Sequence, residues 1–360
     1  MGARLLLVLA AGTAIALAVV ACLPSFSCFT EEDHCGGGGA SNPEASVEAS
    51  ADARGWQRVI HVHTGTSGVP VGYTVRVEAF VDGGHAPADG TNVHVIGANA
   101  EDLDRVVDPP TVPTRSAIWF ALGAPIQPGT DDTTYSLVYG DPDAGVPPAD
   151  GAAVFTSYAD FTGPPPDAGW KTQGPVTFGL GGMLLKPAGA DGGATAESTS
   201  PPPHASNTGV GVEIFAQLPV VTTNGPAAGY YSGDFWLGFQ ATVGSCPYQI
   251  WGVTNVVTSA VLQPRYCVGT GSTDMAGQAT TSNYGFAPHS FRIDRSLAQT
   301  SFFIDDKVQL DAALSDTTEM PVVIRALFTN GDQILVTLVR ARDVVVDEPQ
   351  VTLDPEKPYP

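Results

Sequence analysis

From residue 55 onward, the chain is a series of short apolar alternations, each closed by glycine, proline or aspartate. Its 360 residues include 41 Gly and 30 Pro, and no stretch of this part keeps the 3.6-residue apolar period of an amphipathic helix. Repeated short runs rich in valine, threonine and aromatic residues favour an all-β fold of two β-sandwiches. Strands are predicted at 56–63, 73–80, 92–96, 117–122, 134–139, 210–218, 234–243, 261–267, 322–328 and 334–339, the last extending to 346.

Turn-forming residues mark two hairpins and one long loop. Asp305-Asp306 predicts a tight turn between two apolar runs, and Asn330-Gly331 predicts another between the last two strands. The segment from Pro187 to Ser206 is rich in Gly, Ala, Pro and Ser. Because it offers few apolar side chains to bury, it is expected to be a long loop or a disordered insertion.

The N-terminus has the organisation of an export signal. Arg4 precedes an uncharged apolar run, Leu5 to Val20, that is short for a membrane-spanning helix. The run ends in Val19-Val20-Ala21-Cys22, which resembles the lipobox of bacterial lipoproteins. This resemblance implies that residues 1–21 are a signal peptide and that Cys22 carries the lipid that anchors the protein. The alternative is an ordinary cleaved signal with an incidental cysteine.

Residues 36–54 contain four consecutive glycines, no aromatic residue and no apolar periodicity. They cannot bury enough surface to fold, and a flexible chain of this length spans about 25 Å. Residues 22–54 are therefore expected to form a lipidated tether in the bacterial cell envelope. Leu23 is not the acidic retention residue known from some lipoproteins, which favours the outer membrane and leaves the periplasmic or surface face open.

The four remaining cysteines indicate two disulfides in an exported chain. Three pairings are possible, and Cys28–Cys35 with Cys246–Cys267 is favoured because each pair lies within one segment. A metal site between Cys28 and Cys35 is the less favoured alternative, because cysteines oxidise outside the cytoplasm.

The charge of the chain excludes some partners. It has 16 Lys and Arg against 37 Asp and Glu, a formal charge of −21. Such a surface repels nucleic-acid phosphates and anionic lipid headgroups. Nucleic acid is therefore not expected as a partner, and attachment to the membrane must come from the lipid.

Three motifs in the first folded segment belong together: Gly55–Ile60, Ile118-Trp119-Phe120 and Thr134–Pro142. With Pro128-Gly129 and the segment Val154–Phe161, they resemble a bacterial surface domain of unknown function, number 2341. This resemblance implies a β-sandwich over residues 55–161. The family has no established activity, so only a fold and a habitat are implied.

The rest of the chain carries a second resemblance. Gly169-Trp170-Lys171 and the paired runs Phe291–Arg295 and Phe302–Val308 resemble strands of a concanavalin A-like lectin/glucanase domain, and Val351-Thr352-Leu353 resembles its close. The implied fold is a second β-sandwich, a jelly roll, over residues 162–350. Residues 351–360 are then expected to be a C-terminal tail.

Catalysis is not expected. A glycosidase needs two carboxylates about 5 to 9 Å apart, and a common catalytic family of this fold carries Glu-x-Asp-x-x-Glu on one strand. The chain has no such string and no Gly-x-Ser-x-Gly. A divergent glycan hydrolase is the less favoured alternative.

Three histidines are considered as possible metal ligands. His61 and His63 lie two apart on one predicted strand, so they share a face, and His94 on a neighbouring strand could complete a site. The favoured interpretation is that Ile60 and Val62 form the core face and the histidines are solvated. Calcium is considered because lectin-like jelly rolls often hold it, but no compact ligand spacing is present. No cofactor is therefore expected.

The strongest candidate for ligand binding is aromatic. In the run Phe235–Ala241, alternation places Phe235, Leu237 and Phe239 inward and Trp236 with Gln240 on the other face. Trp251 and Gln249 share a face of the neighbouring segment. An exposed indole beside amides suits a sugar ring, whereas the alternative is that a loop covers both tryptophans.

These patterns predict a non-enzymatic envelope lipoprotein that binds glycan or another surface polymer through its C-terminal sandwich. The alternative from a different class is a structural or protein-interaction component of the envelope without glycan binding. Fold alone does not choose between them.

Overall fold

The computed structural model describes residues 54–78, 85–86, 89–108, 117–161, 169–179, 181–187, 193–218, 233–242, 245–256, 259–268, 275–276, 287–314, 318–328 and 333–360. The expected signal peptide, Cys22, Cys28, Cys35, the rest of the tether up to residue 53 and the expected turn at Asn330-Gly331 lie outside these ranges. Strands dominate the described residues, whose one α-helix is α1 (Gly151–Val154), so the predicted all-β class is confirmed. Within the described ranges, no helix is long and apolar enough to cross a membrane.

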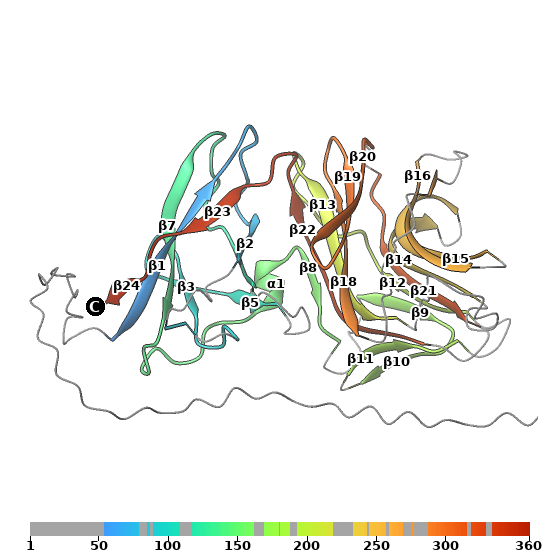
Figure 1. Ribbon diagram of the computed structural model, residues 1–360, viewed down its shortest axis with the longest axis horizontal. Coiled ribbons are helices and arrows are strands. Elements are labelled where there is room, and N and C mark those ends of the chain that lie inside the picture. The colour runs from blue at the N-terminus through green and yellow to red at the C-terminus, as the bar shows by residue number, and fades with distance from the viewer. Residues whose placement is uncertain are drawn as a thin grey trace, which may run out of the picture. The chain divides into compact units, whose positions relative to one another are not determined.

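The first sandwich packs a six-stranded sheet against a three-stranded sheet. The larger has the order β23-β1-β7-β3-β4, with β24 also paired to β1 (Figure 1). Its strands are β1 (Gly55–His63), β3 (His94–Ile96), β4 (Asp102–Leu103), β7 (Asp131–Tyr139), β23 (Gln350–Leu353) and β24 (Lys357–Tyr359). The smaller contains β2 (Thr74–Glu78), β6 (Ala117–Ala121) and β5 (Arg105–Val107), in that order. Ile60, Val75 and Leu137 belong to the core between them.

The C-terminal residues complete this first sandwich. Val351 on β23 lies opposite Val62 on β1, and Tyr359 on β24 lies opposite Gly55. The expectations that residues 351–360 are a tail and that Val351-Thr352-Leu353 closes the jelly roll are therefore wrong. The strand pattern of these residues is local, but their partner lies almost the whole chain away, which no local pattern reveals.

The second sandwich packs an eight-stranded sheet against a seven-stranded sheet, both antiparallel. The first has the order β10-β11-β22-β13-β18-β19-β20, with β8 paired to β22. Its strands are β8 (Ser157–Ala159), β10 (Val176–Gly179), β11 (Gly182–Leu185), β13 (Gly209–Gln217), β18 (Pro288–Arg295), β19 (Thr300–Ile304), β20 (Lys307–Ala312) and β22 (Ile334–Val344). Ile214 and Phe291 of this sheet share one core with Phe235 of the other.

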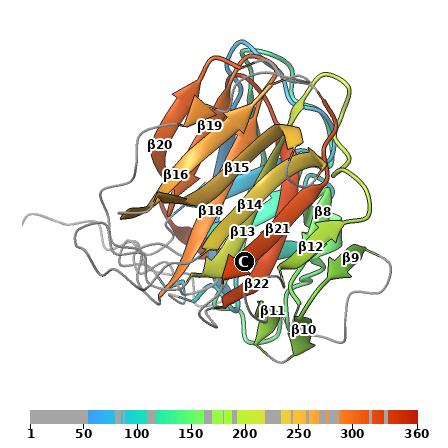
Figure 2. The same cartoon turned by 90° about the vertical axis from the view of Figure 1, so that its right-hand side faces the viewer.

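Figure 2 shows the seven-stranded sheet from its outer side. Its order is β17-β16-β15-β14-β21-β12-β9. The strands are β9 (Trp170–Gln173), β12 (Ala194–Ser198), β14 (Gly233–Thr242), β15 (Ser245–Val256), β16 (Ser259–Cys267), β17 (Met275–Ala276) and β21 (Val322–Phe328). The expectation of a loop or disordered insertion over residues 187–206 is wrong at β12, because Ala194 and Ala196 are fully buried and β12 pairs with β9 and β21.

The second sandwich is inserted in sequence between strands of the first. β8 pairs with β22, so residues 157–159 already belong to the second sandwich, and the chain returns to the first at β23. Both sandwiches belong to one compact unit. The predicted turn at Asp305-Asp306 is confirmed: it joins β19 to β20, and both residues have the positive φ angles, 49° and 62°, of a tight hairpin.

Candidate functional site

The predicted sugar platform lies on the seven-stranded sheet. Trp236 of β14 is paired with Gly252 of β15 on one side and Arg325 of β21 on the other. Residues directly opposite each other on antiparallel strands project from the same face. Trp236 is therefore central to the outer face of this sheet, which is turned toward the viewer in Figure 2.

The Trp236 side chain is half-buried and has polar surroundings. The Arg325 guanidinium lies 5.1 Å from the centre of the indole, within cation–π range, and the Tyr248 ring lies 5.8 Å away. The indole Nε1 has no hydrogen-bond partner among the described residues. Gly252 carries no side chain beside the ring: a Cβ there would lie 3.6 Å from Trp236 Cδ1. The Arg265 side chain lies over this glycine, with its Cδ 3.4 Å from the same Cβ position, and therefore borders the indole above β15.

A small apolar cluster supports this tryptophan. Tyr248, Ile250 and Cys267 are buried on the outer face, and Trp236 and Cys246 pack against them. Cys246 and Cys267 form a disulfide with a Cα–Cα distance of 5.4 Å, so the predicted pairing of these two is confirmed. The disulfide joins the ends of β15 and β16 next to Tyr248, which lies opposite Cys267.

Trp251 and Gln249 do not contribute to this surface, which corrects the prediction for both. They lie opposite Leu237 and Phe239, so they project into the core, and both are fully buried. The Trp251 ring centre is 5.7 Å from that of Phe302, and its Nε1 donates to the Arg292 carbonyl oxygen.

Gln240 is also fully buried and is not available as part of an exposed platform. Two residues earlier, Gly238 has a φ of +146°, and the β14–β15 register shifts just after Gln240. Both irregularities leave the alternation intact as far as Gln240, which lies opposite Tyr248 and so on the predicted outer face; the prediction is wrong in its exposure. Of the four predicted binding residues, only Trp236 lies at the surface.

The three histidines weighed as metal ligands are held by three different carboxylates. His61 contacts Asp354 at 2.9 Å, His63 contacts Asp131 at 2.6 Å, and His94 contacts Asp102 at 2.7 Å. Across the part of the chain that is described, no group of three or more His, Cys, Asp or Glu side chains is placed to hold a metal ion.

A buried charged network, which the sequence analysis did not predict, lies on the outer face of the eight-stranded sheet. Glu213 on β13 is opposite Arg340 on β22, and they are 6% and 2% exposed. Arg340 Nε donates to Glu213 over 2.8 Å, and its Nη2 contacts Asp108, next to β5 of the first sandwich, at 2.7 Å. The guanidinium also lies 4.5 Å from the Trp119 ring centre. The network therefore joins both sandwiches.

Burial and charge act differently on the two carboxylates of this network. Burial raises the pKa of Asp108 despite the neighbouring Arg340. Burial also opposes ionisation of Glu213, but the charge of Arg340, then that of Arg292, outweighs it and lowers the pKa of Glu213 to about 2. Glu213 is thus the carboxylate that Arg340 holds ionised.

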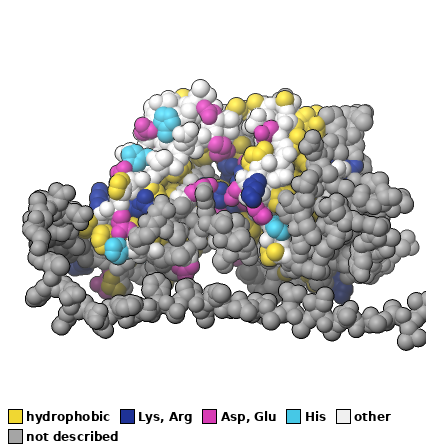
Figure 3. Space-filling view, in the orientation of Figure 1, with side chains coloured by type: hydrophobic (Ala, Val, Ile, Leu, Met, Phe, Trp, Pro, Cys, Tyr) yellow, Lys and Arg dark blue, Asp and Glu magenta, His cyan; other side chains and the backbone are white. Residues whose placement is uncertain are grey.

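A cleft of about 300 Å³ opens beside this network. Tyr73, Arg76 and Trp119 line it from the first sandwich, and Arg292, Phe303 and Arg342 line it from the second. Figure 3 shows a hollow with Arg and Asp or Glu side chains gathered along it.

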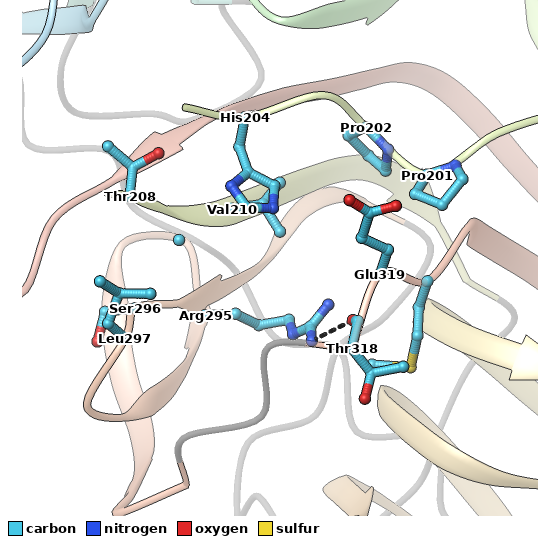
Figure 4. A pocket seen from close by; sticks show the side chains of 12 residues that line it. Pro201, Pro202, His204, Thr208, Val210, Arg295, Ser296, Leu297, Thr318 and Glu319 are labelled. Atoms are coloured by element: carbon cyan, nitrogen blue, oxygen red, sulfur yellow. Dashed lines mark hydrogen bonds between the residues drawn. The ribbon is translucent and has the colours of Figure 1, made fainter. Parts of the chain in front are cut away.

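A second pocket is much smaller, about 30 Å³. Figure 4 shows His204, Arg295 and Glu319 around it, with Arg295 donating to the Thr318 carbonyl oxygen over 2.7 Å. This volume holds a water molecule rather than a sugar ring, and none of the predicted binding residues lines it.

Comparisons with known proteins give no relative by sequence: no protein-family model and no curated protein matches the chain. The resemblance of residues 55–161 to domain 2341 therefore remains a prediction.

Solved structures do match about half of the chain. One belongs to the endo-acting O-glycanases that human gut bacteria express to initiate mucin breakdown, and it has 13% identity, 53% and 99% coverage of this chain and that chain, and a TM-score of 0.42. A family 16 glycosyl hydrolase of Mycobacterium smegmatis has 14% identity, 52% and 99% coverage and a TM-score of 0.38. A Bacillus subtilis carbohydrate-binding module of family 66 has 13% identity, 49% and 96% coverage and a TM-score of 0.33. Because these identities and TM-scores are low, the fold class is assigned from the strand order described above.

Proposed function

We propose that this protein binds glycan, without hydrolysing it, through the outer face of its seven-stranded sheet. The observation that supports the proposal is the environment of Trp236: a half-buried indole in the middle of the sheet, with a guanidinium over its ring and a glycine at its flank. A sugar ring packs its C–H face on an indole and bonds its hydroxyls to neighbouring polar groups.

Binding rather than hydrolysis is supported by the carboxylates of the chain. The catalytic string of the common hydrolase family is absent from the sequence. Glu213 is held by Arg340 in the buried network and is not exposed to a substrate. We expect no release of reducing ends when the purified protein is incubated with polysaccharides it binds. Sustained turnover would contradict this part of the proposal and support a divergent hydrolase.

The test of binding compares two tryptophans on a glycan array. Trp236→Ala should weaken binding at least about tenfold, because it removes the aromatic surface. Trp56→Ala is the matched control: Trp56 is also half-buried, but it stacks on His85 at 3.8 Å in the first sandwich. Equal binding by wild type and Trp236→Ala, with both folded, would contradict the proposal, and no binding by wild type would favour a structural or protein-interaction role.

We further propose that the protein works at the envelope, held by lipid at Cys22 and the tether through residue 54. The lipobox-like end of the signal supports this. Cys22→Ser should move the protein from the membrane fraction to the soluble fraction, and unchanged fractionation would contradict lipid anchoring. No metal is assigned to the binding face, so glycan binding should be unchanged in EDTA.

A further inference from the structure

The cleft between the two sandwiches is built from charged side chains that already neutralise one another. Arg76 contacts Asp306 at 2.6 Å, and Arg292 contacts the other oxygen of Asp306 at 2.8 Å. Arg342 contacts Glu348 at 3.0 Å and Asp294 at 3.1 Å. Every guanidinium that lines the cleft therefore has a carboxylate partner.

An anionic ligand would gain little in this cleft. It would have to displace Asp306 or Glu348 from an arginine, and it would approach a chain of formal charge −21. An uncharged ligand with hydroxyl groups is not repelled by this negative charge. Its hydroxyls can hydrogen-bond to the ionised side chains while the ion pairs between those side chains stay in place.

The walls also hold polar atoms that their neighbours do not satisfy. Asp294 is 8% exposed, and its Oδ1 has no hydrogen-bond partner among the described residues. The same holds for Arg76 Nε on the opposite sandwich. Both atoms are themselves shielded from solvent, and Asp294 Oδ1 lies beside Gly211 of β13. The carboxylates within reach of a ligand hydroxyl are therefore Asp306 and Glu348, which are 31% and 42% exposed.

Apolar surface lies next to these polar groups. Phe303 is half-buried and lines the cleft, with the Arg292 guanidinium 4.0 Å from its ring centre, and Pro349 and Val351 lie on the chain that returns to the first sandwich. Apolar surface combined with a few convergent polar groups is typical of ligand sites, and about 300 Å³ is at the small end of their range.

We propose that this cleft is a second sugar site, which takes one or two residues of an uncharged glycan. The inference rests on the proposed function in that the chain binds glycan, and it adds a ligand class and a site that both sandwiches build. It does not require that the cleft and Trp236 bind the same glycan strand.

The experiment is calorimetric titration of the full chain with lactose, cellobiose and diacetylchitobiose, and with digalacturonic acid as the charged probe. Binding of a neutral disaccharide, and weaker or absent binding of the acid, is expected. Pro349→Trp places a larger side chain in the cleft and should weaken binding at least tenfold. Glu348→Gln, which keeps the shape of the side chain and removes its charge, should change the affinity for the disaccharide at least threefold. Glu319→Gln, a carboxylate outside the cleft, is the matched control and should leave binding unchanged.

Trp236→Ala separates the two sites. Disaccharide binding that survives Trp236→Ala and is lost in Pro349→Trp supports the inference. Disaccharide binding that is lost in Trp236→Ala and unchanged in Pro349→Trp and Glu348→Gln overturns it and leaves the proposed function intact. Tighter binding of digalacturonic acid overturns the ligand class, and absence of any disaccharide binding overturns the inference while array binding still tests the proposed function.

Discussion

Replacing Arg340 with methionine should destabilise the protein by about 3–5 kcal/mol, the cost of leaving a buried charge without its partner. Arg340 is 2% exposed and its guanidinium contacts two buried carboxylates, Glu213 and Asp108. Methionine retains much of the apolar volume that packs against Trp119, so the loss reports mainly on the charges.

The dependence of this loss on pH has a predicted sign. In the wild type the pKa of Glu213 is lowered from 4.5 to about 2, so its contribution to stability is complete above pH 4.5 and is lost as the pH falls toward 2. Without Arg340, Glu213 loses the largest charge that opposes the effect of burial, although Arg292 and Ser290 still favour its ionised form. Asp108, whose pKa burial already raises, loses the Arg340 charge as well, so the pKa values of both carboxyls rise relative to wild type. The variant should therefore gain stability relative to wild type between pH 7 and pH 5, as the buried carboxylates take up protons.

Urea unfolding followed by tryptophan fluorescence at both pH values measures this loss. The control is the triple variant Asp108→Asn, Glu213→Gln, Arg340→Met, which removes all three charges and should recover most of the lost stability. A loss below about 1 kcal/mol for Arg340→Met, or a triple variant no more stable than the single one, would refute the assignment of this network as a buried ion triad.

Three further predictions follow from local contacts. Cys246→Ser with Cys267→Ser should lower the free energy of unfolding by about 3 kcal/mol, because the disulfide closes a loop between residues 21 apart, and equal urea midpoints for variant and wild type would contradict this. Glu356→Gln should flatten the dependence of the unfolding free energy on pH below pH 4.5. Burial opposes ionisation of Glu356, but hydrogen bonds from His85 and Tyr139 lower its pKa, so its contribution to stability is lost as the pH falls through that lowered pKa. An unchanged pH dependence would argue against those hydrogen bonds. Gly238→Ala should destabilise by at least about 1 kcal/mol, since its φ is +146° and a Cβ would lie 2.5 Å from a backbone oxygen, and a thermal melt equal to wild type would contradict the placement of this residue.

Much of the fold could be predicted because a strand can be recognised from the alternation of its own residues and from the turn residues that flank it. The predicted strand at 322–328 coincides with β21, and that at 210–218 is displaced by one residue from β13. The Asp305-Asp306 turn and the disulfide of β15 and β16 were predicted from equally local signals. Pairing between distant strands cannot be recognised in this way, so the sequence predicts a tail where β23 and β24 lie.

The candidate site was predicted less completely, for two physical reasons. Alternation within β14 placed Trp236 outward correctly, but the face of Trp251 depends on the register between β14 and β15, which alternation does not determine. The Arg340–Glu213 network was missed because a charged residue in a strand usually faces solvent. A signal was present: Glu213 is the one charged residue of β13, and its neighbours from Gly209 to Ala216 are all apolar or glycine, which is typical of a strand buried on both faces.

The central claim, that the outer face around Trp236 receives a sugar, is tested most directly by a crystal structure of the protein soaked with an oligosaccharide that it binds. The account predicts electron density for a sugar ring against the Trp236 indole, within reach of Arg325 and Arg265. A bound sugar elsewhere, with the indole uncovered, would contradict it.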